Sequence, residues 1–131
     1  MSAARLVIYG ATGYTGELIA RAAVGRGLRP VLAGRNENAV TALAGELGCD
    51  HRVASLDDPA ALDCALQGAT VTLHCAGPFS ATSAPMVEAC LRQRSHYLDI
   101  TGEIDVLEAV HARDAAARHS GVVLCPATGF D

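Results

Sequence analysis

The chain has 131 residues, of which half are hydrophobic but only 4% aromatic, and it carries a net charge of −4 at pH 7. One domain with its own core fits this length, whereas the acidic balance argues against nucleic acid as a partner and no apolar run reaches the roughly 20 residues of a membrane span. All ten basic residues are arginine, which excludes the lysine of a P-loop nucleotidase and a Schiff-base lysine.

Apolar runs and helical patterns alternate along the chain. The runs predict six strands, at residues 5–9, 30–33, 51–54, 69–75, 96–100 and 122–124. The segments between them predict five helices. Four lie at residues 14–24, 37–47, 85–94 and 103–119, and the other begins at a predicted cap in residues 57–59 and ends at Gly68. Strict alternation implies a parallel sheet with helices on both faces and right-handed crossovers. We therefore expect an α/β, three-layer Rossmann fold, doubly wound, with six strands in the order 3-2-1-4-5-6.

Three glycines follow the first predicted strand, each three residues from the next. A helix that begins at this edge offers unpaired N–H groups and the positive end of its dipole to a phosphate. We expect Gly10 to permit a tight turn, Gly13 to let a pyrophosphate approach, and Gly16 to let the helix pack on the sheet. The alternative is a turn that binds nothing. The spacing is a variant of the dinucleotide-binding fingerprint, and two threonine hydroxyls add donors near the same phosphates. The loop predicted to bind a dinucleotide cofactor is Gly10, Ala11, Thr12, Gly13, Tyr14, Thr15 and Gly16.

Gly34, Arg35 and Asn36 follow the second predicted strand. In NAD-specific domains an acidic residue about 20 positions after the glycines binds the ribose hydroxyls. Arg35 stands here instead, 19 residues after Gly16. A guanidinium attracts a 2′-phosphate and can bond it in two places, and Asn36 can add a neutral donor. The position therefore predicts NADP rather than NAD, with a solvated surface arginine as the alternative.

Two further strand ends fall on the same edge of the sheet. After the third strand, Ser55 and Asp57 can meet the adenine amino group, although Asp57 can equally be only a helix cap. After the fourth strand, small residues let the backbone approach the nicotinamide ribose, and the proline and phenylalanine that follow can pack near the ring. A rigid structural turn is the alternative for this second set: Ala76, Gly77, Pro78 and Phe79.

Acid–base residues are harder to assign. Asp99 and Glu103, in a cluster with Tyr97 and Thr101, either form an acid–base pair or hold a loop and cap the next helix. Capping is the simpler interpretation for Thr101 and Glu103, and Asp99 stays open between the two. Tyr97 has no lysine at the spacing of the Tyr-x-x-x-Lys pair of short-chain dehydrogenases, which excludes that mechanism. The sequence therefore assigns no catalytic residue.

The cysteines and histidines show no metal-binding spacing. The five cysteines are odd in number, widely spaced and without C-x-x-C, as is typical of reduced thiols in a cytoplasmic protein. Cys75 and Cys125 lie at strand ends and are alternative nucleophiles, although burial as small hydrophobic residues is the simpler interpretation. The histidines do not converge, so we expect no metal.

Five motifs span the chain: GATGYTG (10–16), AGRN (33–36), CAGPFSATSAPMVEAC (75–90), HYLDITGE (96–103) and PATGFD (126–131). Together they resemble the nucleotide-binding domain of the saccharopine dehydrogenase-like family, which includes the trans-acting enoyl reductases. The resemblance implies a Rossmann domain that binds NADP or NAD, followed by a second α+β domain. We therefore expect residues 1–131 to be a single Rossmann domain, the N-terminal part of a longer two-domain oxidoreductase. One departure is Ser83-Ala84 before Pro85, where members often have a glycine.

The expected function is to position the nicotinamide of NADP(H) for hydride transfer to a small-molecule substrate held by a domain absent here. The chain alone would then be inactive. The alternative is a regulatory domain that senses NADP(H) without turnover, because fold does not decide function. The expected setting is cytoplasmic, and a homodimer is compatible with the sequence.

Overall fold

Short hydrophobic strands form the middle layer of the protein, whose computed structural model describes residues 4–129. All of the strands pair in parallel, and their order is β3-β2-β1-β4-β5-β6, which confirms the predicted doubly wound sheet. The strand order reverses between β1 and β4, where doubly wound sheets bind their ligands. The strands are β1 (Leu6–Tyr9), β2 (Val31–Gly34), β3 (His51–Val53), β4 (Val71–His74), β5 (His96–Asp99) and β6 (Leu124–Cys125).

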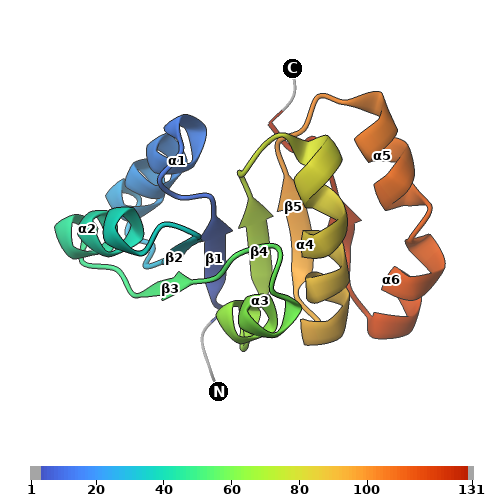
Figure 1. Ribbon diagram of the computed structural model, residues 1–131, viewed down its shortest axis with the longest axis horizontal. Coiled ribbons are helices and arrows are strands. Elements are labelled where there is room, and N and C mark those ends of the chain that lie inside the picture. The colour runs from blue at the N-terminus through green and yellow to red at the C-terminus, as the bar shows by residue number, and fades with distance from the viewer. Residues whose placement is uncertain (1–3, 130–131) are drawn as a thin grey trace.

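Helices form the outer layers (Figure 1). They are α1 (Tyr14–Gly25), α2 (Glu37–Leu47), α3 (Pro59–Leu66), α4 (Phe79–Gln93), α5 (Ile104–His111) and α6 (Asp114–Ser120). Strand alternation divides the core between two faces: Val7 and Tyr9 of β1 pack with α3 to α6, whereas Ile8 packs with α1 and α2. Within residues 4–129, none of the helices is long and apolar enough to cross a membrane.

Two helix predictions were wrong. The fourth helix begins at Phe79 rather than at residue 85, with Pro85 inside it. Proline in a helix costs one hydrogen bond and a backbone clash, but burial of Ser83, Met86 and Val87 on this helix outweighs that local preference. The predicted long helix at 103–119 is divided into α5 and α6 by a break at Arg113, whose backbone leaves the helical region. The break brings the Arg113 guanidinium onto the Glu88 carboxylate of α4, at 2.8 and 2.9 Å.

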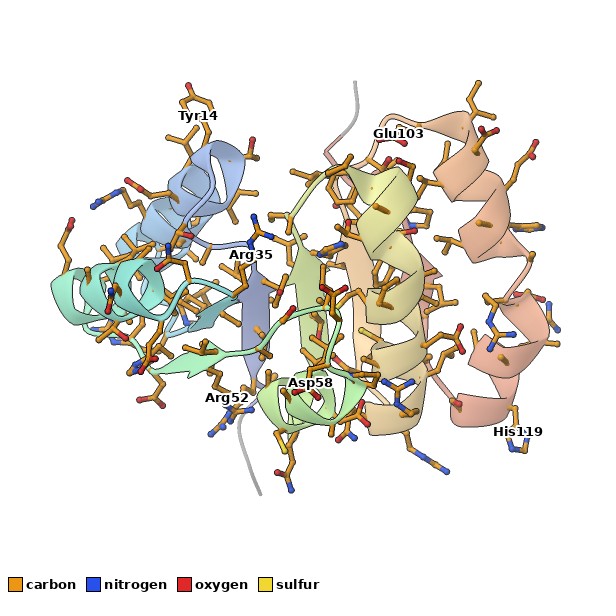
Figure 2. The ribbon with its side chains drawn as sticks, viewed as in Figure 1. Tyr14, Arg35, Arg52, Asp58, Glu103 and His119 are labelled. Carbon is orange, nitrogen blue, oxygen red and sulfur yellow. The ribbon has the colours of Figure 1, made fainter. Side chains whose placement is uncertain are left out.

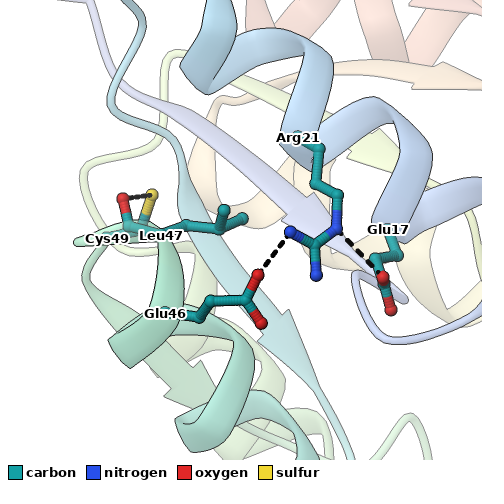
Figure 3. Close-up of polar contacts among 5 residues, drawn as sticks. All are labelled: Glu17, Arg21, Glu46, Leu47 and Cys49. Carbon is teal, nitrogen blue, oxygen red and sulfur yellow. Dashed lines mark hydrogen bonds and ion pairs between the residues drawn. The ribbon is translucent and has the colours of Figure 1, made fainter.

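An ion-pair bridge joins the two helices of the other face. Arg21 of α1 binds Glu17 one turn earlier, at 3.0 Å, and also Glu46 of α2 (Figure 3). The bridge lies on the outside of both helices, while Ala20 and Ala44 are buried on their inner sides. These alanines let α1 and α2 lie close to the sheet, which places the start of α1 directly beyond the end of β1.

Candidate functional site

A cleft of about 690 Å³ lies beyond the carboxyl ends of β1, β2 and β4. Three loops meet there: the glycine loop between β1 and α1, the start of the loop after β2, and the loop between β4 and α4. Most of the residues predicted to contact a cofactor line this cleft, namely Gly10, Thr12, Gly13, Tyr14, Thr15, Gly34, Arg35, Asn36, Ala76, Gly77 and Pro78. Four residues that were not among the predicted cofactor contacts also line it: Tyr9, Leu56, Cys75 and Thr82.

The three glycines of the first loop have different roles in the fold. Gly10 has φ +84°, and a Cβ there would lie 2.7 Å from the backbone nitrogen of Ala76. A Cβ on Gly16, which is buried with Ala11 below the cleft, would overlap the carbonyl oxygen of Gly10. Gly13, by contrast, has φ −75°, which any residue adopts, and a Cβ there would meet nothing closer than 3.5 Å. The fold therefore requires Gly10 and Gly16, but leaves Gly13 free for a ligand.

Gly16→Ala should destabilise the protein by about 2 kcal/mol, because the added methyl group must displace the backbone of the glycine turn. Thermal and urea unfolding monitored by circular dichroism measure the change. Gly45→Ala is the matched control, since a Cβ at this exposed position of α2 has no neighbour within 4 Å and alanine favours a helix over glycine. Equal stability of Gly16→Ala and the parent would contradict the packing role of Gly16.

The start of α1 is the part of the cleft best suited to an anion. Gly13 is the N-cap residue of α1 and provides no side chain to satisfy the first N–H groups of the helix. By contrast, Asn36 and Asp58 cap α2 and α3 with their side chains, through the backbone N–H groups of Ala39 and Ala61 at 3.0 and 3.1 Å. The exposed N–H groups and the dipole of α1 therefore point into a cleft that leaves room for a phosphate.

The residues after β2 supply the positive charge of the cleft. Figure 2 shows the side chain of Arg35 reaching over the carboxyl end of β1, whereas that of Tyr14 points outward. Arg35 forms no ion pair with any residue in the described range 4–129. Burial raises the pKa of the Tyr9 hydroxyl, and the Arg35 charge partly offsets this rise. The oxygen of the Asn36 side chain accepts the capping hydrogen bond, and its amide N–H₂ group can donate to a ligand.

The residues after β3 lie beside the cleft, and only Leu56 lines it. The Ser55 hydroxyl accepts a hydrogen bond from the backbone N–H of Asp57 at 3.2 Å. Asp58, not Asp57, caps α3, which removes the capping alternative for the Asp57 side chain. Contact of Ser55 or Asp57 with adenine stays a prediction.

The loop after β4 faces the cleft with its backbone. Ala76, Gly77 and Pro78 line the cleft, whereas Phe79 begins α4 and packs against the core. The Phe79 ring stands edge-on to the buried ring of His74, with 5.2 Å between centroids. The phenylalanine of this motif therefore supports the floor of the cleft and does not line it.

The polar cluster after β5 holds loops together. The Asp99 carboxylate is fully buried, and it accepts hydrogen bonds from the backbone N–H groups of Thr101 and Ala127, at 3.0 and 2.8 Å, and from the Tyr97 hydroxyl. The Thr101 hydroxyl in turn accepts from the backbone N–H of Glu103 at 3.1 Å. This arrangement favours the structural interpretation of Asp99. The last two residues of the motif at 126–131 lie outside the described residues.

Among residues 4–129, no strong nucleophile or metal site accompanies the cleft. Burial raises the pKa of the Cys75 thiol to about 12, with a further contribution from the Asp99 charge, so this thiol stays protonated at neutral pH and is a poor nucleophile. Cys125 is exposed at the end of β6 and does not line the cleft. Across the described part of the chain, no three or more histidine, cysteine or acidic side chains are arranged to hold a metal ion.

Comparisons with known proteins agree with this geometry. Residues 6–125 match the family model described as the saccharopine dehydrogenase NADP binding domain. The chain is 33% identical to a trans-acting enoyl reductase of Mycobacterium leprae over 96% of its own length, and 28% identical to a saccharopine dehydrogenase-like oxidoreductase of Rattus norvegicus over 97%. It spans about a third of these relatives, 32% and 34% of their lengths.

Two solved structures show the same fold. The apo saccharopine dehydrogenase (L-Glu forming) of Saccharomyces cerevisiae has a TM-score of 0.82 at 16% identity, over 98% of this chain and 28% of that one. The triphenylmethane reductase of Citrobacter sp., complexed with NADP(H), has a TM-score of 0.69 at 20% identity, over 88% and 46%. Since the family model covers nearly the whole chain, the protein belongs to the saccharopine dehydrogenase family, as its NADP-binding domain.

Proposed function

We propose that this domain holds NADP(H) across the carboxyl edge of its sheet and presents the nicotinamide to a substrate bound by residues outside this chain. The pyrophosphate lies at Gly13 and the start of α1, the 2′-phosphate at Arg35, and the nicotinamide half over the loop after β4. The observation that carries the proposal is the glycine at position 13. The fold has room for a side chain there, whereas a phosphate at the start of α1 needs that space.

The bound cofactor would supply hydride chemistry, and this chain would bind and orient it. The α1 N–H groups and Arg35 bind the phosphates, and the small residues of the β4 loop admit the nicotinamide ribose. Asp99 is buried with its carboxylate engaged, and the Cys75 thiol is protonated, so neither supports proton transfer to a substrate. We infer that the acid–base groups belong to another part of the parent protein.

Among residues 4–129, no carboxylate or histidine side chain lines the cleft, which equally favours a second candidate, a domain that senses NADP(H) without turnover. The parent reading frame discriminates between the two, because a substrate domain with its own acid–base residues supports the oxidoreductase. The relatives carry the names of oxidoreductases and enoyl reductases, so a keto acid with an amine and an unsaturated acyl chain are both proposed substrate classes. The five free thiols support a cytoplasmic setting.

Arg35→Ala tests the cofactor assignment. A hydrogen bond to a charged group is worth about 1.5–3 kcal/mol, so the loss should weaken NADPH binding about 10- to 100-fold. NADH lacks the 2′-phosphate, and its affinity should stay nearly unchanged. Calorimetric titration of both cofactors at one fixed ionic strength gives the four affinities.

Arg29→Ala is the matched control, because Arg29 is exposed before β2, at the amino edge of the sheet. This variant removes the same charge and should keep the NADPH preference. Equal affinities of the parent protein for NADPH and NADH would overturn the proposal of an NADP site at Arg35. A preference that survives Arg35→Ala would move the 2′-phosphate contact to Asn36 or to the region of Thr12.

A further inference from the structure

A short hydrogen-bond chain runs from the core to the loop after β4. The Thr82 hydroxyl lies 2.9 Å from the His74 Nε2 atom, 2.6 Å from the carbonyl oxygen of Ala76 and 3.2 Å from that of Pro78. Carbonyl oxygens only accept, and a hydroxyl has one proton, so Thr82 donates to the loop. His74 must then donate its Nε2–H to Thr82. The direction of both hydrogen bonds is therefore set.

One side-chain atom of His74 destabilises the folded protein. Its side chain is fully buried, and its Nδ1 atom has no hydrogen-bond partner in the part of the chain that the structure describes. A buried acceptor without a donor is unfavourable by about 1–3 kcal/mol relative to water. The groups around the ring are Tyr9 of β1, Phe79 of α4 and Tyr97 of β5, at centroid distances of 5.2–6.2 Å. An aromatic ring without nitrogens would pack here at no such cost, so stability does not explain a histidine.

The loop that Thr82 holds lies on one side of the cleft. The proposed anion site at Gly13 is in the middle, and Arg35, which follows the end of β2, is on the opposite side. A dinucleotide whose 2′-phosphate meets Arg35 and whose pyrophosphate meets Gly13 must extend its nicotinamide half toward Ala76 and Gly77. Thr82 also lines the cleft itself.

We propose that His74 and Thr82 are positioning residues that hold the Ala76–Pro78 loop against the nicotinamide half of the cofactor. The inference rests on the proposed function and deepens it, because it assigns the orientation of NADP(H) to a particular pair of side chains. His74 supplies an N–H donor that orients the Thr82 hydroxyl, and Thr82 orients the Ala76 carbonyl. The two residues act on the cofactor through the loop and take no part in hydride transfer.

Two probes separate this role from a general structural one: NADPH, and 2′-phospho-ADP-ribose, which has the same phosphates but no nicotinamide. Thr82→Val keeps the shape of the side chain and removes the hydroxyl. We expect it to weaken NADPH binding about 5- to 10-fold, the effect of one neutral hydrogen bond, and to leave the affinity for 2′-phospho-ADP-ribose unchanged. Thr82→Ser retains the hydroxyl and should restore NADPH binding.

Thr41→Val is the matched control at an exposed position of α2, and neither affinity should change. If Thr82→Val fails to fold by circular dichroism, His74→Phe tests the proposal in its place, because it keeps a packed ring and removes the N–H donor. It should weaken NADPH binding and leave the affinity for 2′-phospho-ADP-ribose unchanged. Unchanged NADPH affinity, or equal loss for both probes, would overturn the proposal. If the parent protein binds neither probe, the proposed NADP(H) function itself fails, which is a distinguishable result.

Discussion

Gly13→Asp should abolish NADPH binding while the fold survives. The position adopts extended backbone, has space for a side chain, and is the N-cap of α1, where aspartate is a preferred residue. The new carboxylate would take the N–H groups that we assign to the pyrophosphate. Two unit charges about 4 Å apart repel by about 4 kcal/mol at an effective dielectric constant of 20, which corresponds to an affinity about 1,000-fold lower.

Isothermal titration with NADPH measures the loss, and thermal unfolding checks that the melting temperature is retained or raised. Gly45→Asp is the matched control: it makes the same substitution and the same change in net charge at an exposed site of α2, and it should bind NADPH as the parent does. An unchanged affinity of Gly13→Asp, with an unchanged circular dichroism spectrum, would show that the phosphates bind elsewhere.

Acid should destabilise the domain through His74. Burial lowers the pKa of His74 from 6.5 to about 4, and the nearby Asp99 charge and the Thr82 hydrogen bond only partly offset this effect. Well above pH 6.5 the imidazole is neutral in both the folded and the unfolded chain. As the pH falls from 6.5 toward 4, the unfolded chain binds a proton that the folded protein does not, so the free energy of unfolding decreases.

The shift corresponds to a loss on the order of 3 kcal/mol by about pH 4, at about 1.4 kcal/mol per pKa unit. Urea unfolding of the parent and of His74→Phe, at several values between pH 7 and pH 4, isolates this contribution, because the carboxylates contribute equally to both proteins. Over this pH range, the free energy of unfolding of His74→Phe should decrease by about 3 kcal/mol less than that of the parent. Replacing the exposed His119 of α6 with phenylalanine should preserve the pH dependence of the parent. Parallel curves for the parent and His74→Phe would refute the assignment.

Much of the candidate site could be predicted because its residues follow strands directly. In a parallel sheet the carboxyl ends of all strands share one edge, so the positions of Gly13, Arg35 and Ala76 along the chain already place them together. The two glycines required by the fold, Gly10 and Gly16, were predictable for the same reason, since a strand that turns at once into a helix needs bare backbone at the turn.

Other features depend on side chains that meet only after folding. The ring of Phe79 turns into the core because His74 lies below it, although the sequence places Phe79 next to cleft-lining Pro78. Thr82 reaches the cleft because α4 begins six residues earlier than the pattern around Pro85 indicates, which brings its first turn to the sheet edge. Asp99 could be read as an acid or as a structural residue until its three hydrogen-bond donors were known.

The sequence by itself determined the fold class, the family and the strand ends that form the cleft, because periodicity and the residues at turns are local properties of the chain. The strand order then followed from the doubly wound fold class. Only the tertiary structure decided which helices begin early or break, which side chains line the cleft and which support it, and how His74 is protonated. Those outcomes depend on burial and on hydrogen bonds between residues from different strands and helices, such as Asp99 with Ala127, and no local pattern encodes them.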